Sequence, residues 1–228
     1  MAGNENSPFK YAVGDHRLTL SGPMGPLQAI LSVPPHARAK SLAVLCHPHP
    51  LFGGTMENKV IFTAHRACRD ASIASLRFNF RGVGESAGEF DHGAGEQHDV
   101  LAVLAWAQAT LGIEELTLIG FSFGAFVAAM VWVKATQASL RGRTLMLIAP
   151  PVTRFPMIGL QLPEGARVIY GNEDEVVDPQ AISDWLETQN AEIEDRVMMG
   201  ASHFFHGRLT DLRDWIRHGI EEGEGRNG

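Results

Sequence analysis

The chain has 228 residues, of which 45% are hydrophobic and 20% are charged. This apolar share is enough to build a buried core and excludes a disordered polar chain, while two cysteines exclude a small disulfide-stapled protein. The formal net charge of −7 argues against nucleic acid as a partner, because phosphate binding needs a basic surface.

The start of the chain is polar and lacks the basic segment followed by an apolar run that marks a signal peptide. No uncharged apolar run reaches the roughly 18–20 residues that cross a bilayer. We therefore expect no membrane partner. We also expect a cytoplasmic protein in which Cys46 and Cys68 stay reduced and buried.

Short apolar runs alternate along the chain with helical patterns. Strands are predicted at 17–22, 27–33, 42–46, 73–80, 116–119, 144–149, 166–170 and 196–199. Helices are predicted at 56–71, 97–111, 123–138, 179–188 and 204–220. The alternation indicates a three-layer α/β/α domain over residues 1–228, with a mostly parallel sheet buried on both faces. The first two strands have no helix between them and are expected to form an antiparallel edge hairpin.

A serine stands in a glycine-rich turn between a predicted strand and a predicted helix. The sequence Gly-Phe-Ser-Phe-Gly occupies positions 120–124. Its flanking glycines relieve crowding in a tight strand-to-helix turn, which would present the Ser122 hydroxyl above the carboxyl edge of the sheet. A chance occurrence is the alternative in a chain with 24 glycines. The strand–turn–helix setting favours a nucleophilic serine.

A serine hydroxyl is a weak nucleophile unless a base removes its proton. Two histidines, His203 and His206, follow the last predicted strand. His203 comes directly after the strand end, where ligands meet open α/β sheets. His206 is expected one turn into the final helix, where a solvated histidine is the commoner case. We therefore favour His203 as the base.

Three acidic residues follow the strand predicted at 166–170 and could orient that base, namely Glu173, Asp174 and Asp178. Asp178 precedes Pro179, at the start of a predicted helix, and is suited to cap that helix. The residues themselves leave the acid open among these three.

The turn at 120–124, the acidic loop and the His203 loop, in this chain order, resemble the α/β-hydrolase fold over residues 17–220. The segment Cys-His-Pro-His-Pro-Leu-Phe-Gly-Gly at 46–54 would supply the oxyanion loop, and Arg-Gly-Val-Gly-Glu-Ser at 81–86 is similar to a turn common in that fold. The short chain and the His-Pro-His-Pro form are most similar to small bacterial hydrolases without a cap, described as carboxylesterases or dienelactone-hydrolase-like proteins.

The resemblance implies a serine esterase that uses no cofactor. Ser122 would attack an ester carbonyl, and His203 would accept its proton and return one to the leaving alcohol. The family's acid lies three residues after the loop glycine, which selects Asp174 to orient and stabilise the imidazole.

The oxyanion of this reaction would be held by the backbone N–H of Phe123 and by a second N–H from the segment 47–51. Pro48 and Pro50 have no N–H, so His49 is the predicted second donor.

Two other interpretations of these motifs are weaker. His47 and His49 could form a metal pair, but no further ligands stand nearby at metal-ligand spacing, so we predict no metal site. Residues 82–87 fit the dinucleotide fingerprint Gly-x-Gly-x-x-Ala, but no helix is predicted directly after them to receive a pyrophosphate.

Only about 15 residues, 152–165, stand where many α/β-hydrolases insert a lid. Their apolar residues are expected to form one wall beside Ser122 or to pack on the sheet. The open site that results favours a small-molecule ester with a short acyl chain.

Other functions use similar sequence features. A thioesterase, a peptidase or another acyl-transfer enzyme would share the same catalytic residues, and a non-catalytic binding module would share the fold. The exposed helix faces and the antiparallel edge could support a homodimer, although nothing in the sequence specifies one.

Overall fold

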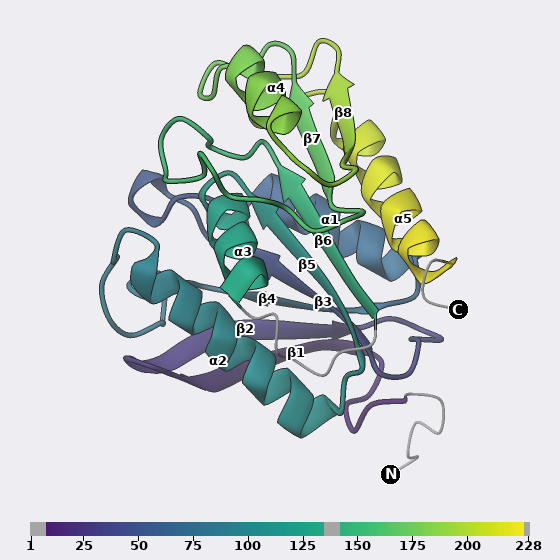
Figure 1. Ribbon diagram of the computed structural model, residues 1–228. Helices are drawn as coiled ribbons and strands as arrows, with labels where there is room; N and C mark the ends of the chain where they lie inside the picture. Colours follow the sequence, from purple (N-terminus) through teal and green to yellow (C-terminus); the bar gives the residue numbers. More distant parts are fainter. Residues whose placement is uncertain (1–7, 135–141, 226–228) are drawn as a thin grey trace.

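The structure is a computed structural model that describes residues 8–134 and 142–225. The described residues form one sheet of eight strands in the order β1-β2-β4-β3-β5-β6-β7-β8, with helices on both faces (Figure 1). The strands are β1 (Gly14–Gly22), β2 (Gly25–Val33), β3 (Ser41–Cys46), β4 (Ala74–Phe78), β5 (Glu115–Phe121), β6 (Gly142–Ile148), β7 (Arg167–Gly171) and β8 (Glu194–Met198). The α-helices are α1 (Lys59–Asp70), α2 (Ala94–Leu111), α3 (Phe123–Lys134), α4 (Pro179–Glu187) and α5 (Leu209–Gly225). The predicted α/β fold is confirmed.

The pairing of the strands follows from their connections. β1 and β2 are joined by a short turn and pair antiparallel, with Leu20 opposite Leu27, which confirms the edge hairpin. β2 also pairs antiparallel with β4. From β4 to β8 every neighbouring pair is parallel, because a helix or a long loop carries the chain back between successive strands.

Two hydrophobic clusters hold the layers together, one on each face of the sheet. The first contains apolar residues of α2, α3 and α4, and the second contains those of α1 and α5. Alternate residues of β3 serve the two clusters: Val44 packs into the first and Leu45 into the second. This double burial explains why the central strands are continuous apolar runs.

Several predicted helix bounds differ from the structure. The helix predicted from residue 56 begins at Lys59, because the side chain of Asn58 caps it by accepting the N–H of Val60 at 2.9 Å. The helix predicted at 97–111 begins three residues earlier, and the last four residues predicted for 123–138 lie outside the described part of the chain.

The final helix shows the largest difference in bounds. We predict it over 204–220, but it covers Leu209–Gly225. Phe205 and Gly207 have positive φ values of 53° and 74°, which are incompatible with a continuous α-helix. The preceding residues therefore form turns, and His203 lies on these turns.

Cys46 and Cys68 are both fully buried and form no disulfide. Within residues 8–134 and 142–225, no helix is long and apolar enough to cross a membrane.

Candidate active site

Ser122 lies at the bend between β5 and α3. Its φ of 53° is in the left-handed region, and its N–H donates to the carbonyl of Ile148 at 2.8 Å, which ties the bend to the end of β6. A Cβ on Gly124 would stand 2.1 Å from the carbonyl oxygen of Cys46, and one on Gly120 would stand 2.2 Å from that of Gly124. Both glycines are therefore required sterically: Gly124 lets the bend pack on the end of β3, and Gly120 lets β5 lie against the first turn of α3.

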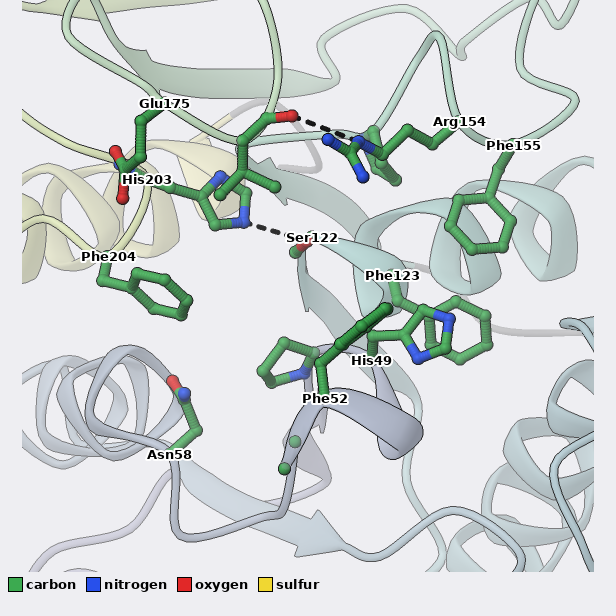
Figure 2. A pocket seen from close by; sticks show the side chains of 15 residues that line it. His49, Phe52, Asn58, Ser122, Phe123, Arg154, Phe155, Glu175, His203 and Phe204 are labelled. Carbon is green, nitrogen blue, oxygen red and sulfur yellow. Dashed lines mark hydrogen bonds between the residues drawn. The ribbon is translucent and has the colours of Figure 1, made fainter.

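His203 lies against Ser122 and joins it to an acid. Its Nε2 is 3.0 Å from the Oγ of Ser122, and its Nδ1 is 2.7 Å from the Oδ2 of Asp174. All three residues are buried, with Ser122 at 9% exposure. The structure thus brings together the three side chains that the sequence singles out, from the loops after β5, β7 and β8. Figure 2 shows Ser122 and His203 of this group.

The two carboxylate oxygens of Asp174 have different hydrogen-bond partners. Its Oδ1 accepts the N–H groups of Val176 and Val177, each at 2.8 Å, which leaves Oδ2 directed at His203. Asp178 instead accepts the N–H of Gln180 at 3.0 Å and caps α4. Among the three acidic candidates, Asp174 is therefore the one that contacts the imidazole.

The loops that carry Asp174 and His203 approach each other closely. A Cβ on Gly171 would stand 2.0 Å from the carbonyl oxygen of Ala201, so only a glycine allows this contact. The N–H of Glu173 donates to the same carbonyl at 3.0 Å. These contacts hold the loop after β8 against the loop after β7, and so keep the imidazole beside its acid.

Glu175 is a residue of the site that the sequence analysis does not single out. Its Oε2 accepts the backbone N–H of His203 at 3.1 Å, so it fixes the backbone beside the imidazole. His206, the rival base, is exposed on the turn before α5, where its ring contacts that of Phe204. It does not lie on a helix as predicted.

Two residues that line the pocket with Ser122, namely Phe123 and His49, have backbone N–H groups without an acceptor in the described part of the chain. Phe123 is the first residue of α3, so its N–H has no acceptor within the helix. His49 precedes the short 3₁₀ helix Pro50–Phe52, and its backbone N–H has no acceptor among the described residues. The loop around His49 is closed by the N–H of Gly54, which donates to the His49 carbonyl at 3.0 Å.

His47 is fully buried next to this loop and forms hydrogen bonds through both of its ring nitrogens. Its Nδ1 lies 2.6 Å from the carbonyl oxygen of Pro48, which can only accept, so Nδ1 carries a proton. Its Nε2 accepts the N–H of Phe80 at 3.0 Å. Both ring nitrogens are therefore engaged, and the neutral ring joins the chain after β4 to the loop that carries His49. The pairing leaves His47 no nitrogen with which to bind a metal.

The pKa of His47 predicts a dependence of stability on pH. Burial lowers this pKa from 6.5 to about 4, although the hydrogen bond to Pro48 opposes the shift. Between these two pH values the unfolded chain binds more protons than the folded one, so the free energy of unfolding rises with pH. This rise is complete above pH 6.5. The shift corresponds to a rise of about 3 kcal/mol.

Urea unfolding at several pH values between 4 and 7 measures this rise in the wild type and in His47→Asn, which keeps a donor for Pro48. The variant is expected to show a smaller rise. Burial also lowers the pKa of His65 to about 4, so His65 contributes to the pH dependence of the free energy of unfolding that His47→Asn retains. His65→Asn is the matched variant that measures this contribution. An identical slope in wild type and His47→Asn would show that His47 does not contribute.

The turn at 81–86 is held by a buried ion pair. The guanidinium of Arg81 donates to Asp99 on α2, with Nη2 at 2.8 Å from Oδ1, and Asp99 is fully buried. In the sequence, Asp99 lies in the first turn of the helix predicted at 97–111, and nothing there indicates its ion pair. No helix follows residues 82–87 directly, since α2 begins at Ala94, and the turn has the structural role of bracing α2 against the end of β4.

Above Ser122 lies a pocket of about 380 Å³ (Figure 2). The apolar residues of the segment 152–165 divide between the two expected places: Phe155 lines the pocket, whereas Met157 and Leu162 are buried in the core. Ile158 does neither and is 83% exposed. Arg154 also lines the pocket and is not singled out by the sequence analysis.

Known proteins are similar to this chain in both sequence and architecture. A family model described as the alpha/beta hydrolase fold matches residues 66–167. An uncharacterized protein of Rickettsia prowazekii is 32% identical over 181 residues, which are 75% of this chain and 74% of that protein.

Among solved structures, an α/β serine hydrolase without a lid from Xanthomonas campestris is 43% identical, with a TM-score of 0.85, over 93% of this chain and 96% of that one. An α/β serine hydrolase homologue from Coxiella burnetii is 36% identical, also with a TM-score of 0.85, over 92% and 100% of the two chains. With its serine, histidine and aspartate in contact at the ends of three strands, this chain belongs to the α/β serine hydrolases that lack a lid.

Proposed function

We propose that this hydrolase cleaves carboxylic esters through an acyl-enzyme on Ser122. The observation that carries the proposal is the line of hydrogen bonds from Ser122 through His203 to Asp174 at the floor of an open pocket. An activated serine needs a base within hydrogen-bond reach and an acid that orients the base, and both are present.

The chemistry proceeds in two halves. The Ser122 oxygen attacks the ester carbonyl while its proton passes to Nε2 of His203, and Asp174 stabilises the imidazolium. The oxyanion accepts hydrogen bonds from the N–H groups of Phe123 and His49. Collapse of this intermediate breaks the ester C–O bond, and His203 protonates the leaving alcohol. Water, deprotonated by His203, then hydrolyses the acyl-enzyme and restores the Ser122 hydroxyl.

The pocket supports short acyl chains as substrates. Its volume of about 380 Å³ is at the lower end of the range for small-molecule sites. Phe123 and Phe155 form one wall, with ring centroids 5.2 Å apart, and the ring of His49 packs 5.1 Å from that of Phe123. This cluster of packed rings limits the depth available to a long alkyl chain.

A substrate panel tests the proposal. p-Nitrophenyl esters from acetate to palmitate are expected to give the highest kcat/KM at short chains, and a fluorophosphonate probe is expected to label wild type at Ser122. Thioesters and anilides with the same acyl groups are the matched comparison. A higher kcat/KM for thioesters or anilides, or no labelling of Ser122, would contradict an esterase.

A further inference from the structure

Arg154 brings a positive charge to an aromatic part of the pocket wall. It lies on the turn that follows β6, where its backbone N–H donates to the carbonyl of Pro151 at 3.0 Å. Figure 2 shows its guanidinium between His203 and Phe155, at the side of the pocket that holds Ser122. The cation therefore shares a pocket with the group that would react.

The guanidinium of Arg154 is held through one of its three nitrogens. Its Nε donates to the carbonyl of Val176 at 3.1 Å, and the N–H of Val176 is itself bound to Asp174. The two terminal amino groups of Arg154 have no hydrogen-bond or ion-pair partner among residues 8–134 and 142–225. The side chain is therefore oriented in advance, with donors left over for a ligand.

Glu175 is the acidic residue in the same pocket wall, and it does not neutralise Arg154 by direct contact. Its carboxylate accepts the backbone N–H of His203, on the other side of the imidazole from Arg154 (Figure 2). The protein as a whole carries a net charge of −7, which repels anions. An attraction for an anionic substrate would therefore have to come from Arg154 itself.

We infer that Arg154 forms a subsite for an anionic group, such as a carboxylate, on the ester substrate. This inference rests on the proposed esterase function and names its substrate class. The planar guanidinium matches the geometry of a carboxylate, and a bound ester would exclude water from the surrounding rings, which strengthens the ion pair. The anionic group can belong to the acyl or to the alcohol part of the ester.

Two pairs of esters that differ only in charge test the subsite. On the acyl side, p-nitrophenyl hemiglutarate is compared with p-nitrophenyl glutaramate. On the alcohol side, 4-carboxyphenyl acetate is compared with 4-carbamoylphenyl acetate. After subtraction of spontaneous hydrolysis, wild type is expected to favour the anionic member of at least one pair by about tenfold in kcat/KM.

Arg154→Gln is expected to reduce that preference to about onefold, chiefly through a lower kcat/KM for the anionic member. Arg196→Gln, which removes an exposed positive charge on β8 outside the pocket, is the matched control and should keep the preference. Salt at 0.5 M should weaken the preference of wild type for the anionic ester. Equal rates within both pairs, or a preference that survives in Arg154→Gln, would overturn the subsite.

Binding separates this inference from the proposed function. In Ser122→Ala, calorimetry compares the affinities for the same ester pairs without turnover, with Arg154 present and with Arg154→Gln. If the affinity difference in Ser122→Ala depends on Arg154 while wild type shows no esterase activity, the anion subsite is supported and the proposed function is contradicted. Equal affinities for both members of each pair would overturn the subsite whatever the rates.

Discussion

Ser122→Ala is expected to lower kcat for p-nitrophenyl acetate by about 10⁵–10⁶, the loss seen when one member of a catalytic unit is removed. The hydroxyl stands 3.0 Å from Nε2 of His203, and alanine leaves the imidazole with no proton to accept. The remaining rate would come from the N–H groups of Phe123 and His49 and from the pocket. Steady-state kinetics, with a stopped assay for the variant, measures the ratio.

Ser202→Ala is the matched control for this substitution. Ser202 immediately precedes His203, and its buried hydroxyl has no hydrogen-bond partner among the described residues. We expect its kcat to stay within about twofold of wild type, because truncation of an unpaired hydroxyl leaves no group unsatisfied. If Ser122→Ala lost less than tenfold, Ser122 would not be the nucleophile.

Asp174→Asn is expected to lower kcat by about 10⁴ while the fold is kept. The N–H groups of Val176 and Val177 would select the amide oxygen of the new side chain, so its NH₂ group would face Nδ1 of His203. A donor there forces the imidazole proton onto Nε2. That nitrogen could then no longer accept the proton of Ser122.

The comparison variant is Asp178→Asn. Asparagine is as good a helix cap as aspartate, and Asp178 contacts Gln180 rather than His203, so we expect a change below about twofold. Equal and small losses in the two variants would remove Asp174 from the proposed triad. Melting temperatures close to wild type would confirm that both variants stay folded.

The parts of this protein that the sequence predicts are those encoded by local patterns. The elbow at Ser122 needs only a strand, two glycines and a helix in succession, and the order of Asp174 and His203 after two strand ends follows from the chain. Because parallel strands bring their carboxyl ends to one edge, these residues could be expected to converge.

The contacts that the sequence could not predict depend on side-chain direction and on residues far apart. His47 bonds to Phe80 across 33 positions, and Glu175 reaches the backbone of His203 across 28. Neither has a motif of its own. Arg154 leaves a weak signal, as the lone cation of the apolar segment 152–165, but whether it faces solvent or the pocket is decided by the fold.

The same reason explains the misplaced start of α5. The segment 204–208 contains Gly207, a poor helix former, and Phe205 adopts a positive φ and is fully buried among the residues of the second cluster. The burial of Phe205 depends on tertiary packing, which the spacing of apolar residues in this segment does not show.

The backbone N–H groups of His49 and Phe123 have a different proposed role from their side chains. If their N–H groups stabilise the oxyanion, that function is set by the main chain and is indifferent to the identity of either residue, whereas their rings form part of the pocket wall. Exchange of these rings for smaller or larger ones would reshape what the enzyme accepts and leave its transition-state donors intact. Directed evolution of this scaffold toward new acyl groups could therefore begin at these two positions of the pocket wall.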